Sequence, residues 1–438
     1  MSDTPKSTHP VLKVAVNVPL SREFDYLPAA DVPVPAPGSR VLVPFGSRQQ
    51  VGLVLRHASE SSLSPGKIRH CSRVLDQAPV LSDQDLKLIR FTSDYYHHPI
   101  GEVVAAALPA LLRQGKPLHP VVETIAITDL GEDIDIETLA KRAPKQAELL
   151  ETLRDAGGNG YEADHLTDVL PNWRRVARSL FEKGLIVRLE QRGADFDETL
   201  APEAEPGPDL NKAQQAAVST LRKGAGFSTY LIEGITGSGK TEVYLHRMRD
   251  IIDQGRQVLV LAPEIGLTPQ LVARLRKRLG IEPALLHSGL TDNERLAAWR
   301  AARSGAARLI VGTRSAIFTP LANPGLIIVD EEHDHSFKQQ EGLRYSARDL
   351  AIVRAKQLDV PVVLGTATPT LEVLQHCRDG NYERIHLPSR AGGAKPPTMR
   401  LIDTVRTPAS DGLSEPLADA IRRHLEADGQ VLIFLNRR

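Results

Sequence analysis

The stretch "TYLIEGITGSGKTEVYLHRMRD", residues 229–250, decides the fold of the longest part of this chain. Its central octet has the spacing of a phosphate-binding loop, and the flanking segments fit the strand and the helix that such a loop joins. Glycines let backbone N–H groups close around a phosphate, and the start of the helix adds a favourable dipole. Lys240 would reach the β- and γ-phosphates, and Thr241 would hold Mg²⁺. The alternative is a glycine-rich turn that matches by chance. The predicted nucleotide site comprises Gly234, Ile235, Thr236, Gly237, Ser238, Gly239, Lys240 and Thr241.

Short apolar runs recur after this loop and alternate with segments of helical spacing. They are rich in Ile, Val and Leu, which is typical of parallel strands buried on both faces. The sequence therefore predicts an α/β domain with a parallel sheet over residues 210–428. The expected strands after the first are "QVLVLAP" (257–263), "ARLIVG" (307–312), "LIIVD" (326–330), "PVVLG" (361–365) and "VLIFL" (431–435).

The run "LIIVDEEHDHSFKQQ", residues 326–340, places four carboxylates and two histidines behind one of these strands. Such a cluster suits either a metal site or the water-activating end of an ATPase. A phosphate-loop enzyme needs a carboxylate at the end of a neighbouring strand to hold Mg²⁺, and Asp330 stands there; Glu331 could polarise the attacking water. The run lacks the spacing of a tetrahedral zinc site, so we assign it to the ATP site. Asp334 and His335 are expected to be solvated.

Composition limits the class of protein. The chain has 438 residues, enough for two to four domains, with 41% apolar and 25% charged residues and a formal net charge of zero. It is thus expected to be soluble, with any nucleic-acid contact confined to local patches. Its two cysteines, Cys71 and Cys377, support neither a disulfide framework nor a four-thiolate zinc site. Since no signal peptide or apolar membrane segment is visible, a cytoplasmic location is expected.

The earlier half of the chain predicts two smaller domains and a linker. Residues 1–115 indicate a β-rich domain, with strands in "VLKVAVNV" (11–18), "SRVLVPF" (39–45) and "QVGLVLRH" (50–57). Residues 120–192 suggest a winged helix, read as a helix, a turn, a basic helix and a hairpin. Residues 193–209 are acidic and proline-rich, which is typical of a linker. Whether the arginines of the basic helix bind DNA or form a solvated face stays open; they are Arg174, Arg175 and Arg178.

Several motifs together resemble those of superfamily 2 helicases. "DEEH" (330–333) and "LGTATPT" (364–370) match two of them, while "LAPEIGLTPQ" (261–270) and "VGTRSAIFTP" (311–320) stand where two others are expected. "LNKAQQAAV" (210–218) resembles the element that recognises adenine, which would place Gln214 at the base. The resemblance implies a RecA-like helicase lobe for residues 210–428.

Longer segments are similar to the bacterial replication-restart helicases. "YYHHPIGEV" (95–103) and "DEEHDHSFKQQEGLRYSARDLA" (330–351) carry this resemblance, which covers essentially the whole chain. It implies an ATP-dependent 3′→5′ DNA helicase that recognises stalled forks and D-loops and initiates primosome assembly. The implied partners are forked and single-stranded DNA, the 3′ end of a nascent strand, other primosome proteins and single-stranded-DNA-binding protein, with no membrane and a monomeric state. Two alternatives stay open: a non-catalytic fork-binding fragment with an ATP site, and a double-stranded DNA translocase.

The resemblance also implies roles for individual residues. His333, Thr366 and Thr368 would couple ATP hydrolysis to the DNA path. A pocket for the 3′ end would use Phe24, Asp25, Gly38 and Arg69, although Phe24 could instead be core, Gly38 a turn residue, and the family commonly has lysine where Arg69 stands. In the segment after Glu331, aromatics among cations suit a single-stranded DNA path, the alternative being that one ring anchors the loop. Those residues are Phe337, Lys338, Arg344 and Tyr345, beside Arg348.

The end of the chain carries one more expectation. Residues 429–438 resemble the start of a second helicase lobe, and the family has a cysteine-rich zinc module beyond that point. We therefore expect a C-terminally truncated fragment with no zinc ligands of its own, which would bind DNA and ATP but not unwind duplexes.

Overall fold

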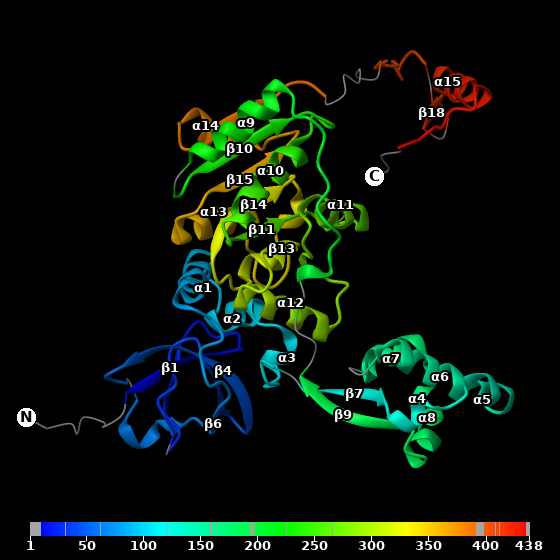
Figure 1. Cartoon of the computed structure of the whole chain (residues 1–438). Helices are drawn as coiled ribbons and strands as arrows, with labels where there is room; N and C mark the ends of the chain where they lie inside the picture. The colour runs from blue at the N-terminus through cyan, green and yellow to red at the C-terminus, as the bar shows by residue number, and fades with distance from the viewer. Residues whose placement is uncertain are drawn as a thin grey trace, which may run out of the picture. The chain divides into compact units, whose positions relative to one another are not determined.

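The computed structural model describes most of the chain in two compact units, Met1–Ser389 and Arg390–Arg438. The described residues are 10–30, 32–61, 63–119, 121–157, 160–192, 196, 198–224, 226–264, 266–390, 398–407, 409–410 and 412–434. Elements are labelled as in Figure 1.

A seven-stranded sheet forms the centre of the first unit, with strand order β12-β13-β11-β14-β15-β10-β16, and each of its pairings is parallel. Alternate residues enter two separate cores: Leu259 and Ile327 pack on one side, Val258 and Ile328 on the other. The sheet is therefore covered on both faces, as its apolar strands predict. The strands are β10 (Thr229–Gly234), β11 (Gln257–Leu261), β12 (Ala284–Leu286), β13 (Leu309–Gly312), β14 (Pro324–Asp330), β15 (Val362–Thr366) and β16 (Glu383–Leu387).

Helices connect these strands and cover the sheet (Figure 1). They are α9 (Lys212–Lys223), α10 (Lys240–Asp253), α11 (Pro269–Leu279), α12 (Asp292–Ser304), α13 (Ala347–Leu358) and α14 (Leu371–Arg378), with short 3-10 helices η4 (Arg314–Phe318) and η5 (His335–Phe337). The prediction of a parallel α/β sheet with the architecture of a RecA-like helicase lobe is confirmed.

The structure differs from that prediction in three details. The sheet has two strands that the sequence did not indicate, β12 and β16, both of them short and at its edges. The unit that holds the sheet ends at Ser389, well before residue 428. Residues 431–434 of the expected strand "VLIFL" form no strand, and Leu435 lies outside the described residues. The second unit contains β17 (Ala409–Ser410), β18 (Leu413–Ser414) and α15 (Glu415–Glu426), a helix without a buried residue.

The N-terminal region forms a six-stranded sheet in the order β5-β2-β1-β4-β3-β6. Its strands are β1 (Val11–Val16), β2 (Phe24–Leu27), β3 (Arg40–Phe45), β4 (Arg48–Ala58), β5 (Arg69–His70) and β6 (Arg73–Val74). Three helices follow: α1 (Asp83–Tyr95), α2 (Ile100–Ala107) and α3 (Ala110–Arg113). Their buried side chains, including Leu88 and Val103, belong to the same hydrophobic core as one face of the helicase lobe. The region is therefore packed firmly against the lobe.

Residues 121–192 have their own hydrophobic core around Trp173 and a three-stranded sheet in the order β8-β7-β9. The strand that follows the basic helix, β9, pairs antiparallel with β7 along its whole length. The expected hairpin after that helix is thus corrected, because the partner strand β7 comes before the helices of this region, α4 to α8, in the sequence. The elements are β7 (Val121–Ile127), α4 (Asp129–Glu132), α5 (Ile136–Arg142), α6 (Pro144–Asp155), β8 (Tyr161–Glu162), α7 (Ala163–Val169), α8 (Trp173–Glu182) and β9 (Ile186–Arg192).

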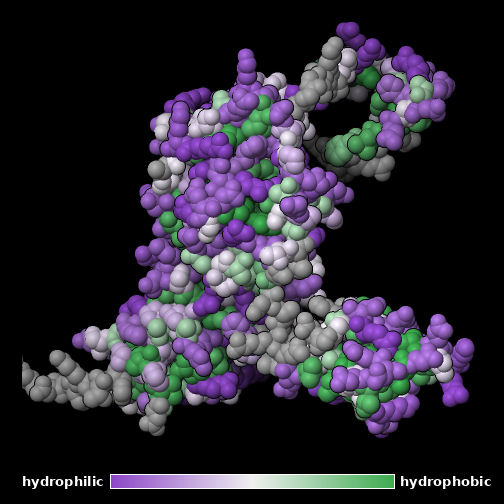
Figure 2. Space-filling model, viewed as in Figure 1, coloured by the Kyte–Doolittle hydropathy of each residue, from purple (hydrophilic) through white to green (hydrophobic). Residues whose placement is uncertain are grey.

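The predicted linker contacts the helicase lobe where it is described. Glu198, in a single 3-10 turn (Glu198–Leu200), accepts hydrogen bonds from the backbone and the guanidinium of Arg308 at 2.7 and 2.6 Å. Residues 193–195 and 197 lie outside the described residues. The outer face shown in Figure 2 is mostly hydrophilic, with hydrophobic residues interspersed in small groups. Among the described residues, every helix is too short or too polar to cross a membrane.

Candidate nucleotide and DNA sites

The phosphate-loop sequence forms a compact turn between β10 and α10. Gly237 and Gly239 adopt φ angles of 81° and 82°, a conformation that favours glycine, and Gly239 immediately precedes the first helical residue, Lys240. The Lys240 ammonium donates to the Gly234 carbonyl at 3.2 Å and lies 3.4 Å from the Glu331 carboxylate. Backbone N–H groups at the start of α10 and this ammonium make the turn a site for anionic oxygens.

Asp330 ends β14, and β15 separates that strand from β10. In the sheet register Asp330 lies opposite Gly365 of β15. The absence of a side chain at Gly365 lets the Tyr244 hydroxyl of α10 donate to Asp330 at 3.2 Å, since a Cβ there would lie 1.5 Å from the hydroxyl oxygen. Burial and the neighbouring Glu331 raise the pKa of Asp330, while Lys240 and Tyr244 oppose the shift. Its neighbours only partly offset the negative charge of this buried carboxylate, so a bound cation would stabilise it.

Glu331 follows Asp330 at the bend that ends the strand. Its φ of 51° is uncommon for a residue with a side chain, and the carboxyl group is 37% exposed. It lies near the Lys240 ammonium and 3.6 Å from Nδ1 of His333. The turn thus presents Glu331 to the phosphate loop instead of burying it.

The remaining carboxylates of the acidic run point elsewhere. Glu332 is buried and accepts hydrogen bonds from Arg348 at 3.0 Å and from the Thr370 backbone at 2.9 Å, so it ties β14 to the loop after β15. No pattern in the sequence indicates this role. Asp334 accepts from the Ser336 N–H at 2.7 Å and stabilises the turn that starts η5. Among the described residues, no group of three or more His, Cys, Asp or Glu side chains could hold a metal ion. The run thus supplies two carboxylates to the phosphate loop and two to the fold.

The three residues expected to couple ATP to DNA lie in contact. His333 Nδ1 is 2.7 Å from the Thr366 hydroxyl, which also accepts a hydrogen bond from the Thr368 backbone N–H at 3.0 Å. Thr366 is fully buried at the end of β15. A continuous series of contacts therefore joins Glu331 to the segment after β15.

Gln214 is placed beside the phosphate loop, but its amide is already engaged. Its oxygen accepts from the Asn211 N–H at 2.9 Å in a capping box at the start of α9. Its nitrogen donates to the Ser238 carbonyl at 3.0 Å, and the side chain is buried. In this conformation Gln214 fixes α9 to the loop, so contact with a base would require these bonds to exchange.

The loop after η5 shows a clear departure from expectation. Phe337 and Tyr345 are 2% and 4% exposed, and Tyr345 packs edge-on against Phe318 of η4 with ring centroids 5.1 Å apart. Burial raises the pKa of Tyr345 to about 12. Both rings anchor the loop, so the expectation that they are open to stack on bases is corrected. The two cations, Lys338 and Arg344, are exposed.

The N-terminal sheet brings Phe24 and Asp25 to one edge. Phe24 packs edge-on against Phe45 with centroids 5.1 Å apart. The Asp25 carboxylate is 6% exposed and accepts from Lys13 at 2.7 Å and from the Ser61 hydroxyl at 2.5 Å. The sequence did not indicate Lys13 or Ser61 as partners of Asp25. The pairing of β1 with β2 places Lys13 opposite Asp25, and this pairing is not visible in the sequence. The group is a buried carboxylate whose hydrogen-bond donors come from two other segments.

The other two predicted pocket residues are Arg69 and Gly38. Arg69 lies close to Asp25 in the sheet, whereas Gly38 has a packing role. Arg69 of β5 is exposed and lies opposite Tyr26 in the sheet register, one residue beyond Asp25. Gly38 has φ 87°, and a Cβ there would lie 2.0 Å from the Leu81 carbonyl oxygen, so it is a packing glycine. Gly46 follows Phe45 in the β3–β4 turn and has open space where a Cβ would stand. The structure thus gives Gly38 a packing role, and Gly46, next to Phe45, is the glycine with open space near the group of Phe24 and Asp25.

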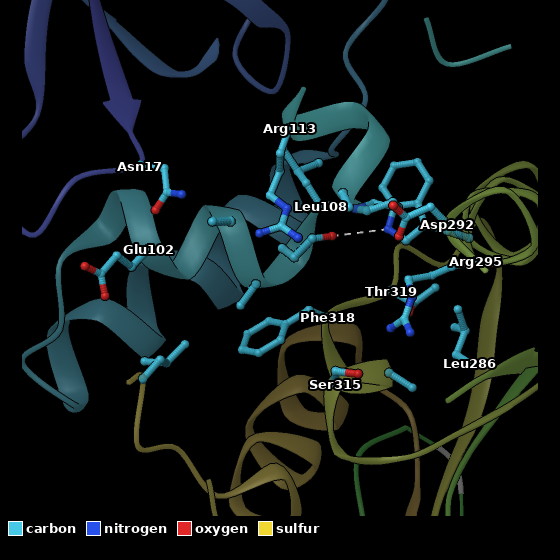
Figure 3. Close-up of a pocket in the computed structure, with 18 residues that line it drawn as sticks. Asn17, Glu102, Leu108, Arg113, Leu286, Asp292, Arg295, Ser315, Phe318 and Thr319 are labelled. Atoms are coloured by element: carbon cyan, nitrogen blue, oxygen red, sulfur yellow. Dashed lines mark hydrogen bonds between the residues drawn. The ribbon is translucent and has the colours of Figure 1, made fainter. Parts of the chain in front are cut away.

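Specific bonds join the N-terminal helices to the helicase lobe. The Trp299 indole N–H of α12 donates to the Ala107 carbonyl at 3.2 Å, drawn as the dashed line in Figure 3. Arg303 donates to the carbonyls of Val80 and Pro79 at 2.9 and 2.6 Å.

A cavity of about 600 Å³ lies beside these bonds, with Asn17, Glu102, Arg113, Asp292, Arg295 and Ser315 among its polar residues (Figure 3). The phosphate loop is not part of its lining.

Comparisons with known proteins identify two regions of the chain, the N-terminal region and the helicase lobe. Residues 13–109 match a family model described as a 3′ DNA-binding domain, and residues 211–376 match one described as a DEAD/DEAH box helicase. The chain is 39% identical over 439 residues to the replication restart protein PriA of Haemophilus influenzae, covering 98% of this chain and 58% of the relative. It is 32% identical to the proteins of the same name from Bacillus subtilis and Chlamydia pneumoniae, covering 61% and 58% of them. The chain thus spans about three fifths of the length of these relatives.

Proposed function

Because this chain belongs to the PriA family of replication restart proteins, we propose that it is the ATP-binding and 3′-end-binding part of an ATP-dependent 3′→5′ DNA helicase that acts at stalled or abandoned forks. The observation that carries this proposal is the juxtaposition of Lys240, Asp330 and Glu331 at one edge of the parallel sheet. Such a set serves nucleotide hydrolysis, which can supply the free energy for strand separation. Fork recognition and primosome assembly, with its partner proteins, would be functions of the whole protein.

The residues present fit ATP with Mg²⁺. The Ser238 hydroxyl, inside the loop, is buried and has no hydrogen-bond partner among the described residues. Burial and the neighbouring Glu331 raise the pKa of Asp330 despite the opposing effect of Lys240, so a bound cation would favour the ionised carboxylate. Thr241 and Asp330 would hold the metal, and the bound ion would neutralise charge on the phosphates.

Different residues of the chain would bind the phosphates, position the attacking water and couple the site to DNA. Lys240 and the N–H groups at the start of α10 would bind and orient the phosphates. Glu331, exposed at its bend and adjacent to Lys240, would accept a hydrogen bond from the attacking water and hold it in line. His333 and Thr366 would then relay occupancy of this site to the loop that bears Lys338. These roles remain proposals.

DNA capture would use a different part of the chain. Phe24 and the carboxylate of Asp25, with Arg69 nearby and the open turn at Gly46, would receive the terminal nucleotide of a nascent strand. Asp25 could accept a hydrogen bond from a 3′-hydroxyl, replacing the one from Ser61.

The test uses two variants of the phosphate-loop site and measures nucleotide and fork binding separately. Lys240→Ala should weaken binding of a fluorescent ATP analogue by at least about tenfold, because charge-assisted phosphate contacts are lost. Glu331→Gln should retain that binding while lowering any hydrolysis by about 10²–10⁴-fold. Both should bind forked DNA as the parent chain does. If neither variant altered nucleotide binding or hydrolysis, the ATP site would be wrongly assigned; if the parent chain bound no fork, the DNA role would be.

A further inference from the structure

The loop between η5 and α13, residues 338–346, has exposed cations but no exposed aromatic ring. Phe337 and Tyr345 are buried, whereas Lys338 and Arg344 are exposed. A single-stranded DNA path generally combines cations that track phosphates with rings on which bases stack. In this structure the rings must therefore come from another segment.

The C-terminal end of α1 supplies them. Phe91 and Tyr95 are stacked, with centroids 5.4 Å apart and planes 13° from parallel, and Tyr95 meets Tyr96 edge-on at 4.9 Å. Tyr95 is 64% exposed, which is unusual for a large aromatic side chain that already has two ring partners. The three rings form an aromatic ladder in which Tyr95 contacts both of the others and is the exposed member.

Direct bonds connect this ladder to the cationic loop. The Tyr96 hydroxyl accepts a hydrogen bond from the Ser346 backbone N–H at 3.2 Å, and the Lys338 ammonium lies 5.3 Å from the centre of the Tyr96 ring. The loop itself is closed by a bridge between Lys338 and Ser346, and Lys338 also donates to the Arg344 carbonyl at 3.2 Å. The rings of the ladder and the cations of the loop thus form one rigid surface from segments about 240 residues apart (from Tyr96 to Lys338, 338 − 96 = 242).

We propose that Tyr95, together with Lys338 and Arg344, is a contact for single-stranded DNA in which the ring stacks on a base and the two cations neutralise neighbouring phosphates. Stacking of Tyr95 on Phe91 holds the ring in place before DNA arrives, so little side-chain freedom is lost on binding. An apolar protein partner would not explain the two exposed cations of the loop. The inference rests on the proposed DNA-binding function and locates one of its contacts.

The experiment separates stacking from charge. Binding of two fluorescein-labelled strands of equal length, oligo(dT) and a fully abasic strand, is measured for the parent chain and for Tyr95→Leu, Tyr95→Phe and Lys338→Ala. Tyr95→Leu keeps apolar cover over Phe91 but removes the aromatic face. It should weaken oligo(dT) binding by about 5- to 100-fold and leave abasic binding almost unchanged. Tyr95→Phe should behave as the parent chain.

Lys338→Ala should weaken both strands alike and reduce the salt dependence of binding by about one counterion. Leu130→Ala, at a side chain of similar exposure on α4, is the matched control and should change neither. Equal oligo(dT) affinity of Tyr95→Leu and the parent chain would overturn the contact, as would an equal loss on both strands. Failure of the parent chain to bind either strand would instead overturn the proposed function itself. Thermal unfolding of each variant confirms that it folds.

Discussion

At the scale of single residues, Asp25 gives the sharpest test of the 3′-end pocket. Its carboxylate already accepts hydrogen bonds from Lys13 and Ser61, and it can exchange the second for a terminal 3′-hydroxyl. We expect Asp25→Asn to remove the preference of the chain for forks ending in a 3′-hydroxyl over forks ending in a dideoxynucleotide, a loss of about 1–3 kcal/mol. Fork binding is measured by fluorescence anisotropy with both ends.

The control for this prediction is Asp76→Asn, which alters a buried carboxylate of the same region that pairs with Arg40. That variant should lower thermal stability but preserve the preference between the two ends. If Asp25→Asn weakened both forks equally, Asp25 would support only the fold of the N-terminal sheet.

The sequence indicates single residues most clearly where the pattern is local. Lys240 and Thr241 follow from an octet of consecutive residues, and Asp330 follows from the strand it ends. Tyr244, Gly365 and Glu332 could not be predicted, because their roles depend on the register between β14 and β15 and on the packing of α10 above them. Gly38 and Gly46 could not be told apart without knowing which one has open space beside it.

At the scale of elements, the burial of Tyr345 in the loop between η5 and α13 can be tested through the ionisation of its hydroxyl group. Burial raises its pKa from 10.0 to about 12, so the folded state favours the neutral phenol. The unfolded chain ionises first as the pH rises, and the stabilisation from the buried neutral ring is lost between about pH 10 and pH 12, by at most about 1 kcal/mol per pH unit. Tyr345→Phe, which cannot ionise, should lose stability less steeply over this range.

Denaturant unfolding of the two proteins at a series of alkaline pH values provides the measurement. Lysines and the other tyrosines titrate in both proteins, so the difference between the two curves belongs to Tyr345. Curves that fall in parallel would show a solvated ring, and the original expectation of an open stacking position would have to be restored.

The elements themselves were predicted with uneven success, for physical reasons. Buried parallel strands such as β11 and β14 are apolar throughout and stand out in any sequence. β16 is exposed at alternate positions as an edge strand, and β2 is only four residues long, so neither gives a strong signal. The partner of β9 lies 59 residues or more earlier in the chain, from Ile127 to Ile186, and such pairings leave no local trace.

At the scale of the whole molecule, the predicted boundary between a 3′-end domain and a helicase lobe does not interrupt the core. Residues of α1, α2 and the N-terminal sheet share one hydrophobic cluster with α13 and β14. Arg354 of α13 lies at this junction and is fully engaged. It donates to the carbonyls of Ile317 and Thr319 at 2.5 and 2.6 Å and lies 3.6 Å from the Asp85 carboxylate of α1.

We therefore predict that Arg354→Leu destabilises α1 and α13 together. Removing one partner of a buried pair costs about 3–5 kcal/mol, because Asp85 loses its cation and two carbonyl groups lose their donor. Hydrogen exchange should show the same fall in protection for amides of both helices, since their cores are continuous. Arg222→Leu, which breaks an exposed pair with Asp250, should cost less than about 1 kcal/mol and leave both helices protected. Loss of protection in α13 alone would contradict the prediction, because it would show that the N-terminal region and the lobe unfold independently.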